Sequence, residues 1–364
     1  MTTNLFTPIS LAGQTLPNRI MVAPMCQYSA DEGRATDWHL IHWGQFALSG
    51  AGLFMIEATA VNAEGRITPG CLGLWNDAQE EAIARNLARV KAFSDIPIGI
   101  QLGHAGRKSS AFRPWEGPGH YAPSQGGWLV KGPSALPFAD KWPVPEAMTA
   151  DEIAAVVADF AASAQRAVRL GLKVIEIHAA HGYLLSSFLS PRANQRTDRY
   201  GGTAENRRRL PMEVFAAVHA VCPEDVAVGM RINGTDWLED GITPDEAVAM
   251  AEALYAAGGD FVDVSSGGNA PARIPVGPGY QLPFASRIRR EVGITTITVG
   301  MIRSPLHAES IVTCNEADMV ALGRGFLNDP RWPWHAAEKL GHTLEVAKQY
   351  QFGATSQYRP TVGR

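Results

Sequence analysis

Residues 149–178, TADEIAAVVADFAASAQRAVRLGLKVIEIH, contain an amphipathic helix, a glycine and an apolar strand in succession. Thr149 followed by Glu152 is a capping-box pattern, which predicts that a helix begins here. Gly171 stands where the C-cap of that helix is expected. The run Val174–His178 lacks the alternation of a half-exposed strand, so it predicts a strand that is covered on both faces.

The same succession of strand and helix recurs along the chain. The predicted strands are Arg19–Met25, Leu53–Thr59, Ile98–Leu102, Val174–His178, Ala227–Ile232, Phe261–Ser265, Thr296–Val299 and Met319–Leu322. The predicted helices are His39–Ser49, Asp77–Val90, Ala150–Leu170, Asn206–Val221, Thr243–Ala257, Leu282–Glu291, Pro305–Val312 and Arg331–Leu340. Eight βα units with buried strands favour a parallel α/β barrel of the TIM type over a sandwich.

Three segments lie outside this repeat within a predicted single domain, residues 1–364. Residues 1–18 contain a hairpin-like pattern, ISLAGQTLPN, which could plug the bottom of a barrel. Residues 103–149 form a long excursion after the third strand, and loops of that length are usually functional. Residues 341–364 are expected at a subunit contact because aromatic side chains gather there and just before it: Trp332, Trp334, Tyr350 and Phe352.

Composition excludes several classes of protein. A net charge of -4 offers no basic face for nucleic acid. The longest apolar runs, such as Leu53–Val61, are too short to cross a bilayer, and the N-terminus has no signal-peptide pattern. The four cysteines contain no CxxC pair, so no zinc site or iron–sulfur cluster is indicated. We therefore expect a reduced, cytoplasmic protein.

Polar and unusual residues recur at the C-terminal ends of the predicted strands, where TIM barrels build their active sites. After strands seven and eight, Gly300 and Gly323 allow close backbone approach and Arg324 offers a guanidinium, which together favour a phosphate site. The Ser265–Gly268 segment, including Gly268, adds donors on the same side. Taken one at a time, these residues also have structural explanations: each glycine could form a tight turn, and Arg324 could form a surface ion pair.

Around this phosphate site the sequence predicts a pocket for a flat heterocycle. Ala58 is small, Gln101 can pair with a donor–acceptor edge, and Arg231 can stabilise negative charge on a reduced ring. FMN fits these residues, although they do not name the ring uniquely. His178, His181 and Tyr183, just after strand four, offer two hydrogen-bond donors for an oxygen and one O–H for proton delivery.

Five motifs together resemble the Old Yellow Enzyme family of flavin-dependent ene-reductases, in particular its bacterial subgroup with a cysteine after the first strand. They are PMCQYSADEGRATDWH (24–39), EATAVNAEGRITPG (57–70), QLGHAGRKSSAFRPWEG (101–117), HAAHGYL (178–184) and ALGRGFLNDPRWPWH (321–335). The resemblance covers nearly the whole chain. It implies an NADPH dehydrogenase that reduces enones, quinones, maleimides or nitro compounds by ping-pong hydride transfer, as a homodimer or homotetramer.

The resemblance also implies roles for individual residues. It places non-covalent FMN against Pro24, Met25, Cys26, Ala58, Gln101, Arg231, Gly300, Gly323 and Arg324. Cys26 would tune the flavin, His178 and His181 would bind the acceptor oxygen beside Tyr28, and Tyr183 would donate the proton. Some relatives insert a C-terminal arginine into the partner's active site, whereas this chain has Tyr350 and Phe352 in that region.

Four other functions compete with this interpretation. His178 and His181 form an H-x-x-H that could bind a metal, but no third ligand is near in the sequence. A Schiff-base aldolase needs a lysine at a strand's C-terminal end, and Lys173 lies at the start of one. A glycosidase needs two carboxylates at the mouth, whereas Glu57 and Glu176 lie within strands. A non-catalytic flavin-binding protein would not need the histidines and the tyrosine.

Overall fold

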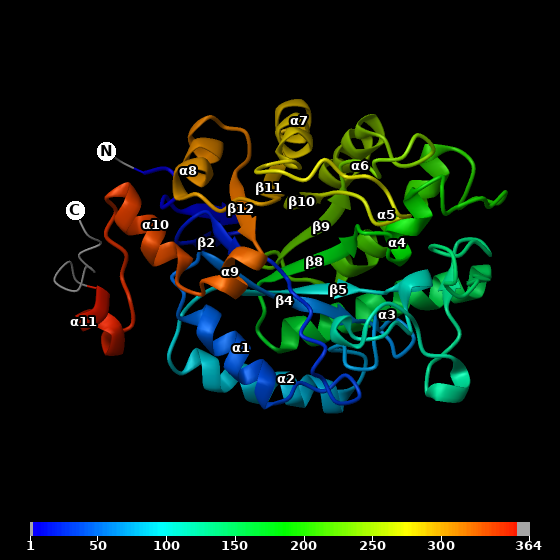
Figure 1. The fold of residues 1–364 in the computed structure, drawn as a ribbon, viewed down its shortest axis with the longest axis horizontal. Coiled ribbons are helices and arrows are strands. Elements are labelled where there is room, and N and C mark those ends of the chain that lie inside the picture. The colour runs from blue at the N-terminus through cyan, green and yellow to red at the C-terminus, as the bar shows by residue number, and fades with distance from the viewer. Residues whose placement is uncertain (1–2, 355–364) are drawn as a thin grey trace.

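The computed structural model describes residues 3–354, and its centre is a closed barrel of eight parallel strands (Figure 1). Each strand pairs in parallel with its neighbours, which confirms the TIM barrel predicted from the sequence. In order around the barrel the strands are β10 (Phe261–Ser265), β11 (Thr295–Val299), β12 (Met319–Leu322), β3 (Ile20–Val22), β4 (Leu53–Ala60), β5 (Ile98–Gly103), β8 (Val174–Ala179) and β9 (Ala227–Asn233).

Helices lie around the outside of this barrel (Figure 1). The eight predicted helices are present with ends moved by only a few residues: α1 (Asp37–Ala47), α2 (Asp77–Lys91), α3 (Ala150–Arg169), α5 (Ala204–Val221), α6 (Pro244–Ala256), α7 (Leu282–Val292), α8 (Pro305–Thr313) and α10 (Trp332–Leu340). Three short helices were not predicted: α4 (Leu184–Leu189), α9 (Arg324–Asn328) and α11 (Gln351–Ala354). In the part of the chain that the structure describes, no helix is both long and apolar enough to span a membrane.

The unit of α3 and β8 shows why the local sequence folds as it does. The Thr149 amide donates to Glu152 Oε2 at 2.8 Å and the Glu152 amide donates to Thr149 Oγ1 at 3.3 Å, so the predicted capping box forms. After the helix, Gly171 has φ +71°, a left-handed conformation that glycine adopts without a Cβ penalty. All six residues of β8 are buried, as expected for a strand between the barrel interior and the helices.

Side chains alternate along each strand, and this period sorts the barrel interior into layers. Val174 of β8 belongs to an apolar cluster at the N-terminal end of the barrel, together with Ala227, Phe261 and Ile297 of the next three strands. Two residues further along, β8 carries Glu176, β10 carries Asp263 and β9 carries Gly229, with Arg231 a further two residues along β9 and Gln101 on β5. At the mouth, the same faces of β8, β9 and β10 carry His178, Asn233 and Ser265.

The predicted N-terminal hairpin consists of β1 (Ile9–Leu11) and β2 (Gln14–Leu16), paired in antiparallel fashion. Leu11 and Leu16 are 2% and 0% exposed and belong to the same apolar cluster as the N-terminal ends of the barrel strands. The hairpin therefore packs against the end of the barrel opposite the mouth. Residues 1–2 of the predicted segment lie outside the described residues.

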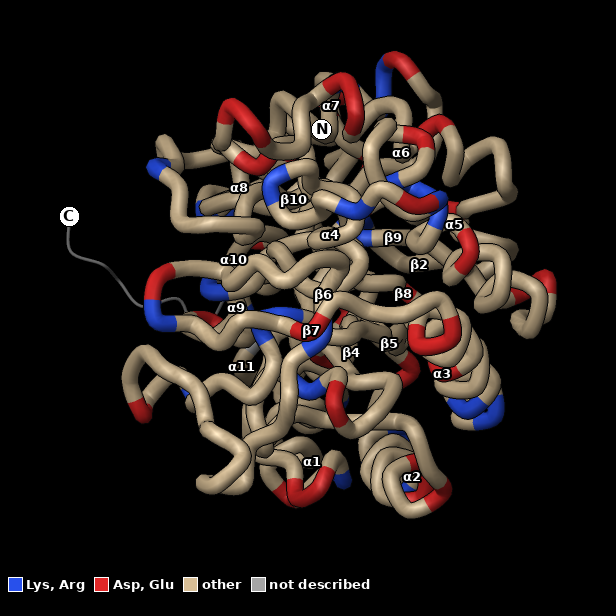
Figure 2. The backbone as a smooth tube through the Cα atoms, turned by 90° about the vertical axis from the view of Figure 1, so that its right-hand side faces the viewer, with Lys and Arg blue, Asp and Glu red and all other residues tan. Residues whose placement is uncertain are grey.

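The excursion after β5 contains short 3-10 turns and one small parallel pair, β6 (Lys131–Gly132) with β7 (Glu146–Ala147). The 3-10 turns are Gly106–Lys108, Pro114–Glu116 and Pro123–Gln125, and a fourth, Lys348–Tyr350, precedes α11. Figure 2 shows lysine and arginine positions interspersed with aspartate and glutamate along the backbone, which agrees with the small net charge of -4.

Candidate active site

The predicted donor cluster assembles in the turn after β8. The ring centroids of His178 and His181 are 5.1 Å apart, and the Tyr183 ring is 5.0 Å from His178 and 6.5 Å from His181, all three pairs edge to face. His181 has φ +61° and Gly182 φ +72°. A Cβ on Gly182 would lie 1.9 Å from the Gly268 carbonyl oxygen, so only glycine fits this turn.

Burial keeps the two imidazoles neutral and the phenol protonated. Burial, followed by the charge of Arg231, lowers the pKa of both His178 and His181 well below the usual value. His178 Nδ1 accepts the Ala180 amide at 3.2 Å, so the proton of this ring is on Nε2, where it can be donated to an oxygen. Burial also raises the pKa of Tyr183 well above 10.0, which leaves the O–H available as an acid.

Lys108, at the start of the excursion, was not singled out from the sequence. Its Nζ donates to the His181 carbonyl at 2.8 Å and lies 3.3 Å from the Gly268 carbonyl. The ammonium sits 5.1 Å from the Tyr183 ring centroid and 4.5 Å from that of Phe138. Burial lowers the pKa of Lys108 to about 8. These contacts tie the excursion to the turn that carries the two histidines.

Cys26 and Tyr28 follow β3, which is shorter than predicted because the chain leaves the barrel after Val22. Burial raises the pKa of the Cys26 thiol well above its usual value, so the thiol is not an activated thiolate. Glu57 Oε2 accepts the Gln27 amide at 2.5 Å, and its Oε1 lies 3.1 Å from Nε2 of the buried His39. This carboxylate holds the loop that carries Cys26.

A cavity of about 320 Å³ lies where the loops after β11 and β12 meet the barrel mouth. Gly300 has φ +136°, and a Cβ there would press on Gln281 and Tyr280 at 3.2 Å. The predicted residues that line the cavity are Pro24, Met25, His181, Arg231, Gly300, Gly323 and Arg324. Four further residues line the cavity: Ser265, Tyr280, Gln281 and Arg303. Of these, only Ser265 lies in a segment that the sequence predicted to supply hydrogen-bond donors.

The other predicted residues, including Cys26 and Tyr28, do not line this cavity. Ala58, His178 and Tyr183 line a small adjoining hollow of about 10 Å³, room for roughly one water. Gln101 donates its Nε2–H to Glu176 Oε1 at 2.7 Å, which leaves its amide oxygen for another partner. Gly268 packs against the backbone of His181, since a Cβ on Gly268 would lie 2.4 Å from the His181 carbonyl oxygen.

The residues present fit a flat, phosphorylated ring system such as FMN. The buried Nε of Arg231 has no hydrogen-bond partner among residues 3–354, although Asp263 Oδ2 lies 3.2 Å away. Glycines line the end of the cavity that carries the Arg324 guanidinium, so a phosphate can approach the backbone closely. A polar partner for Arg231 at one end and an anion near Arg324 at the other would satisfy both groups.

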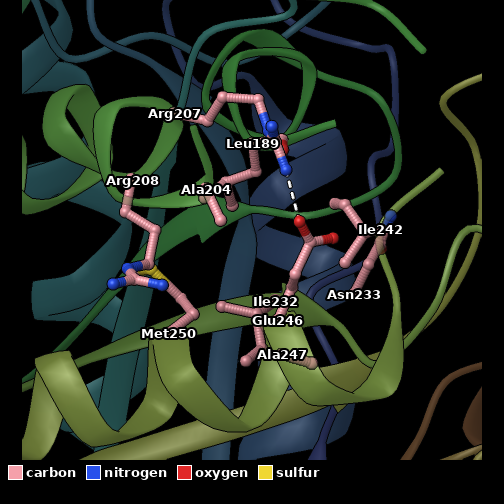
Figure 3. A pocket seen from close by; sticks show the side chains of 10 residues that line it. All are labelled: Leu189, Ala204, Arg207, Arg208, Ile232, Asn233, Ile242, Glu246, Ala247 and Met250. Carbon is pink, nitrogen blue, oxygen red and sulfur yellow. Dashed lines mark hydrogen bonds and ion pairs between the residues drawn. The ribbon is translucent and has the colours of Figure 1, made fainter. Parts of the chain in front are cut away.

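A hollow on the outside of the barrel, between α5 and α6, is not a comparable site (Figure 3). It contains about 20 Å³, enough for roughly one water. Arg207 and Glu246 form an ion pair across it. This hollow is therefore part of the packing between the two helices.

The structure bears on the competing functions. Among the described residues no group of three His, Cys, Asp or Glu side chains could hold a metal ion. Lys173 pairs with Asp225 at the end of the barrel opposite the mouth, as its position in the sequence predicts. Glu57 and Glu176 are both buried within strands. Lys173 and the two glutamates are therefore not placed for aldolase or glycosidase chemistry, and the assignment of His178 and His181 to an acceptor oxygen rather than a metal stays a prediction.

The subunit contact expected at residues 341–364 stays a prediction, and the aromatic residues that suggested it differ in exposure. Trp332 is only 6% exposed, and its indole N–H donates to the Arg303 carbonyl at 2.8 Å, so it belongs to the core beneath α10. Trp334 and Tyr350 meet edge to face at 5.9 Å with Arg331 stacked on both rings. Phe352 is 85% exposed. Residues 355–364 of the predicted contact lie outside the described residues.

Comparison with known proteins gives consistent matches. Residues 4–343 match the model of the NADH:flavin oxidoreductase / NADH oxidase family. An NADPH dehydrogenase of Geobacillus thermodenitrificans is 44% identical over 97% of this chain and 99% of its own length. An NADH:flavin oxidoreductase of Gibberella zeae is 43% identical over 95% of this chain and 88% of its own. Among solved structures, morphinone reductase superposes with a TM-score of 0.79 at 30% identity, covering 94% of this chain and 91% of that one.

Proposed function

Because the chain belongs to the NADH:flavin oxidoreductase / NADH oxidase family and is an FMN-dependent oxidoreductase, we propose that it is an NADPH-dependent ene-reductase. The family match also confirms the resemblance to the Old Yellow Enzyme family inferred from the sequence. The proposed substrates are small acceptors with an activated C=C bond, such as enones, quinones and maleimides, and nitro compounds. Relatives named NADPH dehydrogenase support NADPH as the hydride donor.

The observation that carries this proposal is the position of His181. Its side chain lines the cavity that ends at Gly300 and Arg324, and its ring lies 5.1 Å from that of His178. An acceptor oxygen held by the two histidines would therefore lie beside the pocket that we assign to FMN. The chemistry that FMN supplies when bound is hydride transfer, taken from NADPH and passed to the acceptor in ping-pong order.

The protein's own residues do the remaining work. His178 and His181 donate hydrogen bonds to the acceptor oxygen and stabilise the negative charge that develops on it. Because both rings are neutral, they act as donors without losing a proton. Tyr183 delivers the proton to the carbon next to the activated group, and its raised pKa keeps it protonated at neutral pH. Tyr28 completes the acceptor pocket.

Cys26 is assigned as a modulator of the flavin. Its half-buried, protonated thiol is a poor nucleophile. Pro24 and Met25, which directly precede it in the sequence, line the cavity, so the segment that carries Cys26 begins at the pocket wall. Ala58, Gln101 and Gly268 complete the proposed cofactor contacts beside Arg231. We further propose that the protein acts in the cytoplasm as a homodimer or homotetramer, which light scattering after gel filtration would determine.

Anaerobic NADPH oxidation tests the function. The purified protein should be yellow with one FMN per chain, and it should oxidise NADPH with cyclohexenone, a maleimide or a quinone. Cyclohexanone is the matched control, because it has the same carbonyl without the C=C bond and should not be reduced. NADPH oxidation with dioxygen but with none of these acceptors would exclude the ene-reductase function. A folded protein that gains no visible absorbance with added FMN would exclude the cofactor site.

A further inference from the structure

We propose that Asn233 is a positioning residue for the acceptor site, because its side chain holds the backbone of His181 in the left-handed conformation that directs the imidazole into the cavity. The inference rests on the proposed function only for the role of His181 toward an acceptor oxygen. The backbone conformation that it explains belongs to the resting protein, so it can be tested without turnover.

His181 has a backbone conformation that needs support. Its φ of +61° lies in the left-handed region, which costs free energy in a residue with a Cβ. The direction of the Cα–Cβ bond depends on this φ, so relaxation to an ordinary φ would change the direction of the imidazole. The peptide groups on both sides of His181 are held: its amide donates to Asn233 Oδ1 at 3.0 Å, and its carbonyl accepts from Lys108 Nζ at 2.8 Å.

Two backbone groups determine the orientation of the Asn233 side-chain amide. Asn233 is the last residue of β9 and is only 1% exposed. Its Nδ2 donates to the Gly267 carbonyl at 2.8 Å, while its Oδ1 accepts the His181 amide hydrogen. Because a backbone carbonyl can only accept and a backbone N–H can only donate, the amide oxygen must face His181. The side chain therefore joins the loop after β10 to the turn after β8.

A buried acidic side chain keeps Asn233 in this orientation. Asp236 is 0% exposed, and its Oδ1 accepts Asn233 Nδ2–H at 2.9 Å. Its Oδ2 accepts the Ile242 amide at 3.0 Å and the Ser190 hydroxyl at 2.6 Å, so Asp236 cannot turn without losing these bonds. Asparagine suits this position because its short side chain ends in both an acceptor and a donor. A chain of hydrogen bonds thus runs from Asp236 through Asn233 to the backbone of His181.

The first test is the exchange rate of the His181 amide hydrogen in the oxidised holoenzyme, measured by NMR. Ala180 and His181 form the only Ala-His pair in the sequence, so ¹³C-carbonyl alanine combined with ¹⁵N-histidine identifies this one amide. We expect exchange about tenfold slower than in a peptide of the same sequence, since a hydrogen bond of ordinary net strength changes an equilibrium by up to about that factor. Exchange at the rate of the peptide would overturn the proposal without any variant having to fold.

A double-mutant cycle then tests whether Asn233 acts through His181. The probe is 4-cyanophenolate, a mimic of an enolate oxygen, titrated calorimetrically into the oxidised holoenzyme at a pH where it is ionised and without NADPH. Asn233→Ala should weaken its binding about tenfold, since the displaced imidazole loses a hydrogen bond to a charged oxygen. In the His181→Ala background the same substitution should change the affinity by less than about twofold. Equal losses in both backgrounds would show that Asn233 supports only the fold, and would refute the positioning role.

Ser190→Ala is the matched control, because the Ser190 hydroxyl bonds Asp236 Oδ2 but neither Asn233 nor His181. It should change neither the exchange rate nor the phenolate affinity, and a loss equal to that of Asn233→Ala would refute a specific role for Asn233.

Enone reduction by the unsubstituted protein is measured separately, so the two proposals can fail independently. Reduction of enones with equal losses in the two backgrounds would refute the positioning role alone. Coupled losses without enone reduction would refute the proposed function alone. An unsubstituted protein that does not bind the phenolate would overturn the inference whatever the result with enones.

Discussion

Replacing Glu176 with glutamine should raise the free energy of unfolding above that of the unsubstituted chain. The gain should be larger at alkaline pH than at acid pH. Glu176 is 0% exposed in the barrel interior, and burial, followed by the charge of Asp263, raises its pKa from 4.5 to about 8. Its Oε1 accepts the Gln101 amide hydrogen, which a glutamine oxygen can also accept. Glutamine therefore keeps the shape and the hydrogen bond while it removes the titration.

The sign follows from proton binding. Between the unfolded pKa near 4.5 and the folded pKa near 8, the folded protein retains the Glu176 proton and the unfolded chain releases it. The free energy of unfolding therefore falls as pH rises through this window, and the loss is complete above the folded pKa. One pKa unit corresponds to about 1.4 kcal/mol, so the loss is at most about 5 kcal/mol. Glu176→Gln should recover about 2–5 kcal/mol between pH 5 and pH 9.

The assay is urea unfolding of both proteins with excess FMN at several pH values from 5 to 9. The buried histidines titrate in both proteins, so their contribution to the pH dependence of unfolding cancels when the variant is compared with its parent. Glu81→Gln on the exposed surface of α2 controls for the loss of one surface charge. Parallel curves of unfolding free energy against pH for Glu176→Gln and its parent would refute the argument, as would a gain already complete at pH 5.

Three further substitutions have defined outcomes. Tyr183→Phe should slow the oxidative half-reaction with enones by about 10²–10⁴-fold while leaving flavin reduction by NADPH nearly unchanged; stopped-flow rates that fall equally in both would contradict the proton-donor role. Cys26→Ala should shift the flavin reduction potential, measured by dye equilibration, yet retain turnover, and its complete inactivity would argue for a direct chemical role instead. Gly182→Ala should lower the melting temperature clearly more than Gly202→Ala, because both glycines have positive φ but only at Gly182 would the new Cβ strike backbone, the Gly268 carbonyl; equal melting temperatures would show that the turn can relax.

Much of the candidate site could be predicted because it lies at strand ends. Parallel strands in a barrel bring all their C-terminal ends to one mouth. Four predicted residues therefore meet there independently of the loop conformations: Arg231, Gly300, Gly323 and Arg324. His178, His181 and Tyr183 are close in sequence, and one turn suffices to group their rings. The burial of Trp332 could not be predicted, because an aromatic residue near a helix start gives no sign of which face it will bury.

The sequence by itself determined the order of strands and helices, the capped helix ends and the mouth at which chemistry gathers, because these depend on periods of 2 and 3.6 residues and on local turn chemistry. Only the tertiary structure decided the partners of the polar groups: Lys108 on the His181 carbonyl, Ser265 on the imidazole, and Asp263 near Glu176. These pairs join residues up to 87 positions apart along the chain, as with Glu176 and Asp263. Their proton positions depend on distances and burial that arise only when the barrel closes.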